Sequence, residues 1–156
     1  MILLGQLLTS SNYDDQDKKV TGGRNGFGAK LANIFSTEFI VETGDRNARM
    51  TYKQVFTANM SCKGEPQIEK KVRTENFTKV SFKPDLAKFK MQNLDEDIVA
   101  LMTKRVYDIA GITPVKVQFN GKLVSVNSFP KYVDLYLETK EHRDLPKITQ
   151  ERSDRW

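Results

Sequence analysis

Apolar and polar residues alternate in the first half of the chain in a way that predicts successive β-strands. Four strands are expected, at residues 37–43, 50–57, 67–72 and 76–82. Turn-forming residues lie between them, notably Gly44-Asp45-Arg46-Asn47 and Gly64-Glu65-Pro66. Strands that follow one another so closely favour a largely antiparallel meander.

The second half changes to a helical period. Asn93-Leu94-Asp95-Glu96 has the pattern of a capping box, and the helical spacing that follows continues until Gly111, which predicts a helix of roughly 17 residues. The residues on this face are Leu94, Ile98, Leu101, Met102, Arg105 and Ile109. Alternation over residues 115–126, with Asn120-Gly121 in the middle, predicts a hairpin, and residues 129–137 predict a short amphipathic helix.

A glycine-rich loop lies ahead of the strands. Residues 22–28 contain glycine at four positions, and residues 29–35 read as a helix that begins directly after the loop. Glycines allow consecutive N–H groups to converge on an anion, a helix N-terminus adds positive potential, and Lys30 adds a point charge. The loop therefore indicates a phosphate site, although an ordinary turn closed by a surface lysine has the same composition.

Spacing argues against two familiar glycine motifs. A dinucleotide fingerprint requires G-x-G-x-x-G after a strand, whereas this loop reads G-G-x-x-G-x-G after the polar residues 12–21. A P-loop requires lysine directly after the last glycine and then serine or threonine, but Ala29 intervenes and Leu31 follows Lys30. The nucleotide site expected here is of another kind.

The run GQLLTSSNYDDQDKKVTGGRNGFGAKLANIF, residues 5–35, closely resembles the ATPase region of eukaryotic type IIA DNA topoisomerases, which belong to the GHKL superfamily. The resemblance continues through residues 82–91, 94–102 and 115–121. It implies an α+β fold, the two-layer GHKL (Bergerat) sandwich of a mixed sheet with helices on one face, with the N-terminal part missing. Residues 1–138 would form a partial ATPase domain with an ATP lid at 9–30, and residues 139–156 a linker and the start of a transducer domain.

The same resemblance implies which residues hold ATP. The Ser-Ser-Asn element would contact the ribose and phosphates, and the glycine box would wrap the triphosphate. These residues are Ser10, Ser11, Asn12, Gly23, Arg24, Asn25, Gly26, Phe27, Gly28, Ala29 and Lys30. Phe27 stands where the family usually has tyrosine, and Ala32 where cysteine is common, so modest effects on binding are expected.

Catalytic residues of the family are expected outside this chain. The acid that activates water and the asparagine that holds Mg²⁺ would lie upstream of Ser10, yet residues 1–8 contain no acid. The Gln-Thr-Lys loop would lie downstream. General base catalysis requires a positioned acceptor, so this polypeptide alone is expected to be inactive, with its magnesium ligands elsewhere.

The resemblance implies part of an ATP-dependent DNA topoisomerase that passes one duplex through another. The cofactors would be ATP and Mg²⁺, the partners DNA and a second copy of the full-length protein, and the location the nucleus. The chain would then be a fragment of the enzyme. The alternative is a truncated, non-catalytic paralogue that acts as a nucleotide-binding or interaction module.

Composition does little to distinguish a fragment of the enzyme from a truncated paralogue. The chain has 156 residues, a net charge of +5 and a pI near 9.3, a balance that fits either nucleic-acid contact or a solvated basic surface. A single cysteine, Cys62, excludes an internal disulfide framework, and His142 is the one histidine, which argues against a metal cluster. No apolar stretch is long enough to predict a membrane span.

Overall fold

The computed structural model describes residue 23 and residues 26–137. The chain divides into two compact units between Gln92 and Asn93, and each is described separately. Residues 139–156, expected to form a linker and the start of another domain, lie outside the described residues, so the predicted boundary at residue 138 stays a prediction.

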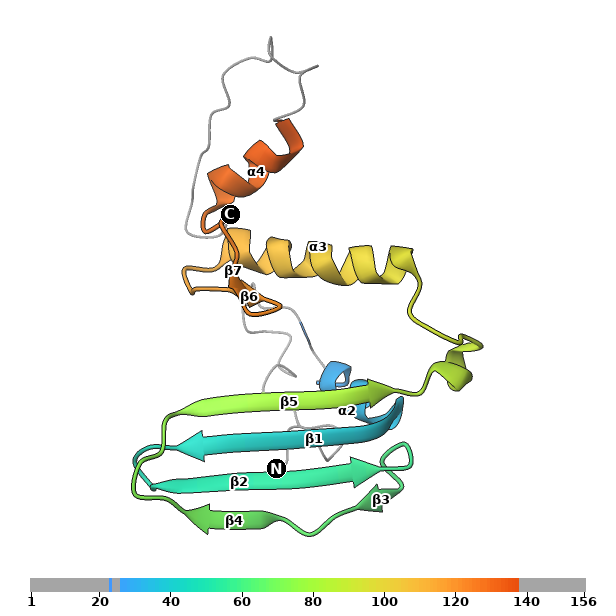
Figure 1. The fold of residues 1–156 in the computed structure, drawn as a ribbon, viewed down its shortest axis with the longest axis vertical. Coiled ribbons are helices and arrows are strands. Elements are labelled where there is room, and N and C mark those ends of the chain that lie inside the picture. Colours follow the sequence, from blue (N-terminus) through green and yellow to red (C-terminus); the bar gives the residue numbers. More distant parts are fainter. Residues whose placement is uncertain (1–22, 24–25, 138–156) are drawn as a thin grey trace, which may run out of the picture. The chain divides into compact units, whose positions relative to one another are not determined.

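Among the described residues, the first unit is an antiparallel sheet with one short α-helix (Figure 1). Its helix α2 (Gly28–Ile34) is followed by β1 (Ser36–Asp45), β2 (Met50–Thr57), β3 (Cys62–Lys63), β4 (Gln67–Lys70) and β5 (Phe77–Pro84), and then by a 3₁₀ turn, Leu86–Phe89. The four predicted strands are present with small shifts at their ends. The two-residue strand β3 was not predicted.

The strand order differs from the predicted meander. β5 pairs with β1 rather than with β4, so the order is β3-β2-β1-β5, and β4 pairs with the outer edge of β2 (Figure 1). A meander was the wrong prediction, because alternation identifies a strand without specifying its neighbour. Cross-strand ion pairs agree with the observed register: Glu38–Lys83 at 2.8 Å and Glu42–Lys79 at 2.9 Å join residues directly opposite each other.

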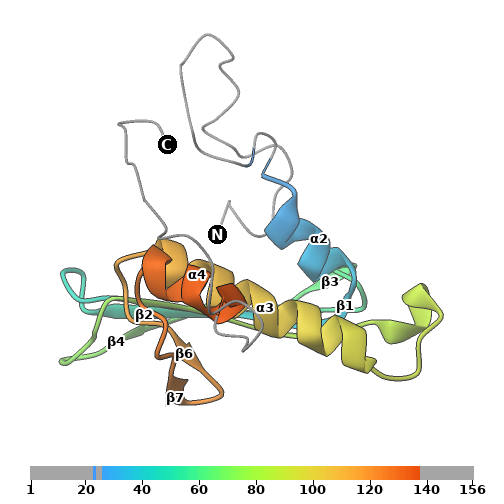
Figure 2. The same cartoon turned by 90° about the horizontal axis from the view of Figure 1, so that it is seen from above.

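A small aromatic core holds α2 on the sheet. Phe39, Val41 and Phe56 are each 1% exposed, and Ala32 of α2 and Met60 pack against them. The rings of Phe39 and Phe56 meet edge to face with centroids 6.4 Å apart. Figure 2 shows α2 on one face of the sheet, where β1 begins. The core therefore fixes the helix into which the glycine-rich loop leads.

The second unit contains α3 (Glu96–Ile112), the hairpin β6 (Gln118–Phe119) and β7 (Lys122–Leu123), and α4 (Phe129–Leu137). Its core is Ala110, Val124 and Val126, with the partly buried Val106, Tyr107 and Tyr132 packed around it. Asn120 and Gly121 have φ of 49° and 77°, which confirms the predicted turn. Both predicted helices are present, and α4 has the predicted bounds.

Two details of α3 differ from prediction. Its N-cap is Asp95, whose carboxylate accepts the N–H of Ile98 at 2.8 Å, and not Asn93. Gly111 does not end the helix, because it lies within α3 against Tyr132, and the C-cap is Thr113. Asn93 and Asp95 are both common N-cap residues, so the sequence pattern alone did not show which of them precedes the first turn of α3.

Candidate functional site

The described part of the predicted nucleotide site is its C-terminal half. Gly23, Gly26, Phe27, Gly28, Ala29 and Lys30 are described, whereas Ser10, Ser11, Asn12, Arg24 and Asn25 lie outside the described residues. The roles assigned to all of them stay predictions. The geometry of the described residues nevertheless tests whether they suit a phosphate chain.

Two glycines of the loop adopt left-handed backbone conformations. Gly23 has φ of +84° and Gly26 has φ of +65°, a region that side chains with a Cβ rarely occupy. A Cβ added at Gly23 or at Gly28 would have no heavy atom within 4 Å among its surroundings. Positive φ therefore explains glycine at positions 23 and 26, while the space beside positions 23 and 28 is open.

The start of α2 carries no side-chain cap. Phe27 is the N-cap residue, its φ and ψ are −82° and −25°, and no side chain accepts a hydrogen bond at this end. The first intrahelical bond runs from the N–H of Leu31 to the carbonyl of Phe27, at 2.8 Å. The preceding N–H groups have no intrahelical acceptor, which is the arrangement that suits an anion at a helix start.

Lys30 is a buried cation attached to the loop. Its side chain is 1% exposed, and its Nζ donates a hydrogen bond of 2.7 Å to the carbonyl oxygen of Gly26. An ammonium group has three donors, so this bond leaves two more for other acceptors. The bond also holds the left-handed Gly26 next to the helix start. A buried positive charge beside backbone N–H groups fits a polyphosphate and does not fit an apolar ligand.

Hydrogen bonds anchor the site to the sheet. The Oγ of Ser36 donates to the carbonyl of Ala32, and the N–H of Asp85 donates to the carbonyl of Phe35 at 2.8 Å. The rings of Phe35 and Phe89 also contact each other, with centroids 5.2 Å apart. The C-terminal end of α2 is thus fixed to both β1 and the segment after β5.

Metal ligands are a separate matter. The described residues contain no group of three or more His, Cys, Asp or Glu side chains placed to hold a metal ion.

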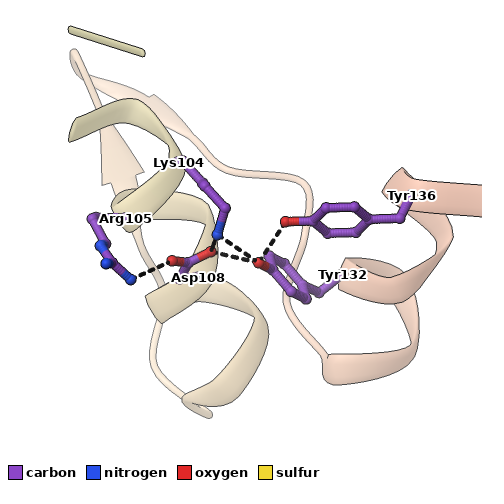
Figure 3. Close-up of polar contacts among 5 residues, drawn as sticks. All are labelled: Lys104, Arg105, Asp108, Tyr132 and Tyr136. Carbon is purple, nitrogen blue, oxygen red and sulfur yellow. Dashed lines mark hydrogen bonds and ion pairs between the residues drawn. The ribbon is translucent and has the colours of Figure 1, made fainter. Parts of the chain in front are cut away.

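A second polar cluster lies in the second unit, and sequence analysis missed it. Asp108 of α3 accepts hydrogen bonds from Lys104 at 2.8 Å, from Arg105 at 3.2 Å and from the hydroxyl of Tyr132 on α4 (Figure 3). Tyr132 also contacts the hydroxyl of Tyr136 at 2.8 Å. The spacing of Lys104, Arg105 and Asp108 is recognisable in the sequence as charges on one helix face. No sequence pattern, however, indicates that Asp108 contacts a tyrosine on another helix.

These contacts shift the pKa of each partner. The hydrogen bond from Lys104 and the one from Tyr132 lower the pKa of Asp108. The same carboxylate raises the pKa of Lys104, and the hydrogen bond to Asp108 raises the pKa of Tyr132 to about 12. The cluster therefore favours an ionised carboxylate, a charged lysine and a neutral tyrosine, and it joins α3 to α4.

Comparison with known proteins gives a consistent result. No family model matches the chain. It is 57% identical to the DNA topoisomerase 2 of Arabidopsis thaliana over 161 residues, which cover 99% of this chain and 11% of that protein. It is 53% identical to human DNA topoisomerase 2-alpha over 159 residues, again 99% of this chain and 10% of the relative. The chain thus spans about a tenth of the length of these relatives.

The fold agrees with the sequence match. The crystal structure of the ATPase region of Saccharomyces cerevisiae topoisomerase II has a TM-score of 0.81 and 53% identity, with 88% of this chain and 36% of that chain covered. The described α+β architecture is therefore that of a GHKL ATPase domain. Within this class, the chain belongs to the eukaryotic type IIA DNA topoisomerases and corresponds to a portion of their ATPase region.

Proposed function

We propose that the chain is part of the ATP-binding domain of an ATP-hydrolysing type II DNA topoisomerase, an enzyme that passes one DNA duplex through another. The observation that carries this proposal is the 57% identity to a DNA topoisomerase 2 across 99% of the chain. No observation favours the alternative of a non-catalytic paralogue. The whole enzyme would act in the nucleus as a homodimer on DNA.

The proposed nucleotide site combines the loop with the start of α2. Gly23 and Gly26 turn the backbone, Gly28 and Ala29 present N–H groups at the helix start, and Lys30 supplies a positive charge. Ser10, Ser11 and Asn12 would hold the ribose and phosphates, and Arg24, Asn25 and Phe27 would complete the lid. Bound ATP would supply the phosphate chain around which these groups are arranged. Magnesium would be held by residues beyond this chain.

A binding measurement tests the proposal. Calorimetry with a non-hydrolysable ATP analogue is expected to show binding to the chain, and Lys30→Ala to weaken it more than the 0–1 kcal/mol of an exposed charge pair, or more than about fivefold. Lys79→Ala is the matched control, since Lys79 pairs with Glu42 on the sheet. Absence of analogue binding by the unmodified chain would contradict a nucleotide site in this polypeptide.

Lys30→Ala removes both the hydrogen bond to the carbonyl of Gly26 and the positive charge, so a second variant is needed to separate the two effects. Lys30→Gln keeps a donor for the carbonyl of Gly26 and removes the positive charge. It is expected to weaken analogue binding nearly as much as Lys30→Ala while retaining the thermal midpoint. Wild-type affinity in Lys30→Gln would remove the Lys30 charge from the phosphate site.

A further inference from the structure

A polar hollow lies at one end of the sheet in the first unit, where two connections meet. One is the β1–β2 turn and the other is the connection from β4 to β5. The hollow has a volume of about 1000 Å³. Its lining residues are Arg46, Asn47, Arg49, Val72, Arg73, Thr74, Glu75 and Asn76.

Hydrogen bonds hold the two connections together. The N–H of Arg46 donates to the Oδ1 of Asn76 at 2.8 Å, and the N–H of Lys71 donates to the carbonyl of Arg49 at 2.8 Å. Within the turn, the carboxylate of Asp45 accepts from the N–H groups of Asn47 and Ala48 at 2.8 and 2.9 Å. The backbone on both sides of the hollow is therefore ordered by the protein's own contacts.

The side chains around the hollow carry an excess of positive charge. Arg46, Arg49 and Arg73 are exposed, and none of them forms an ion pair with a carboxylate among the described residues. Glu75 is the one acid in the lining, and the nearby Lys71 pairs with Glu69 at 3.4 Å. Three guanidinium groups thus face solvent around one concavity without a protein partner among the described side chains.

The shape and chemistry of the hollow indicate its ligand. Guanidinium forks match phosphate oxygens with two parallel hydrogen bonds. Val72 is the one aliphatic side chain in the lining, so an apolar ligand does not fit. Arginines contributed by two separate connections suit a chain of phosphates better than a single ion.

We propose that this arginine hollow binds the phosphate backbone of duplex DNA. The choice of DNA rests on the proposed function, whereas the hollow lies at the end of β1 opposite to the end that follows α2. Contacts of this kind position a protein on DNA and carry no base sequence information. The hollow would therefore add sequence-independent affinity outside the nucleotide site.

The test compares two triple variants that remove the same charge. R46Q/R49Q/R73Q removes the three arginines of the hollow, and K63Q/K88Q/K90Q removes three exposed lysines that do not line it. Fluorescence anisotropy with a labelled DNA duplex is measured at several salt concentrations for the 156-residue chain and both variants. Far-UV circular dichroism checks that each variant retains its secondary structure.

The arginine variant is expected to bind DNA at least about tenfold more weakly at low salt. The slope of log K against log[salt] should become shallower by roughly 2–3, since each lost phosphate contact removes about 0.9. The lysine variant should keep most of the affinity and slope. An equal loss in both variants, or no loss in the arginine variant, would overturn the proposal.

Two further measurements show whether a negative result contradicts the DNA contact or the proposed nucleotide site. Displacement of the DNA by polyglutamate at an equal concentration of charge would identify an acidic peptide as the better ligand and overturn the assignment to DNA. The ATP analogue should bind the arginine variant with wild-type affinity. Analogue binding without any DNA binding by the wild-type chain would overturn the DNA contact and leave the proposed nucleotide site intact.

Discussion

Gly26 has a backbone conformation that constrains the proposed nucleotide loop. Its φ of +65° lies in the left-handed region, and its carbonyl accepts the bond from Lys30. We expect Gly26→Ala to cost about 1–2 kcal/mol in stability or analogue affinity, and Gly26→Val to cost more, because a β-branched residue is a severe outlier there. Thermal unfolding and calorimetry measure the two effects.

Gly28→Ala is the stability control for this comparison. Gly28 lies in α2 without a left-handed φ, and an added Cβ there meets nothing within 4 Å. The thermal midpoint of Gly28→Ala should equal or exceed that of the wild type, since alanine has a higher helix propensity than glycine. Equal midpoints for Gly26→Val and wild type would show that the loop does not need the observed φ.

The need for glycine at position 26 was predictable from the sequence, but the position of Lys30 was not. Four glycines in one loop indicate positive φ for some of them, because few other residues reach that region. A lysine in the first turn of a helix is usually solvated, whereas Lys30 is buried and bonded to a carbonyl four residues earlier. That arrangement depends on tertiary packing of α2, which local composition does not encode.

At the scale of elements, Gly111 allows α3 and α4 to approach closely. A Cβ at this position would lie 2.6 Å from the Cβ of Tyr132 and 2.8 Å from its Cγ. These atoms are near the backbone of α4, so a rotamer change cannot relieve the clash. We expect Gly111→Ala to destabilise the second unit by about 1–3 kcal/mol in chemical denaturation, despite the higher helix propensity of alanine.

A second variant checks this explanation. In a Tyr132→Gly background, the Cβ and Cγ that the added methyl group would meet are both gone, and Gly111→Ala should become neutral or stabilising. The non-additivity of the two changes is the measured quantity. Additive losses in the double variant would show that Gly111 is required for another reason.

The Asp108 cluster predicts a pH dependence for the second unit. The pKa of Asp108 is lowered by Lys104 and Tyr132, so the stability from its ionised form is complete above the ordinary carboxyl pKa near 4 and is lost as pH falls through the lowered value. The pKa of Tyr132 is raised to about 12, so its contribution is lost as pH rises from about 10 through that value.

Thermal midpoints at pH 6 and pH 3 measure the acid side. Asp108→Asn should be less stable than wild type at pH 6 and lose less on acidification. Asp134→Asn removes an exposed carboxylate of α4 and should keep the acid sensitivity of wild type. Identical pH profiles for Asp108→Asn and wild type would contradict the assignment.

Element positions were largely predictable, whereas element pairing was not. The strands, α3, the Asn120-Gly121 turn and α4 follow from period and turn chemistry within short windows. The pairing of β5 with β1 and the bond from Tyr132 to Asp108 join residues far apart in sequence. Such contacts depend on which surfaces meet in the folded unit, and no local pattern records them.

At the scale of the whole molecule, the sequence predicts binding without turnover. No acid precedes the Ser-Ser-Asn element in this polypeptide, so a positioned general base is missing from the place where the family resemblance puts it. The purified 156-residue chain should therefore show no ATP hydrolysis above buffer in a coupled assay. Steady turnover that a Gly28 substitution abolishes would instead indicate a local base among Asp14, Asp15 and Asp17.

The central place of β1 has a consequence for synthesis on the ribosome. β1 and β2 form a hairpin of neighbouring segments, but the second edge of β1 is covered only by β5, residues Phe77–Pro84. Until β5 emerges, a nascent chain presents an unpaired strand edge with Phe39 and Val41 incompletely covered. At ordinary rates of translation this interval lasts on the order of a few seconds. Protection by ribosome-bound chaperones would therefore matter most between the emergence of the first strand and that of the fifth.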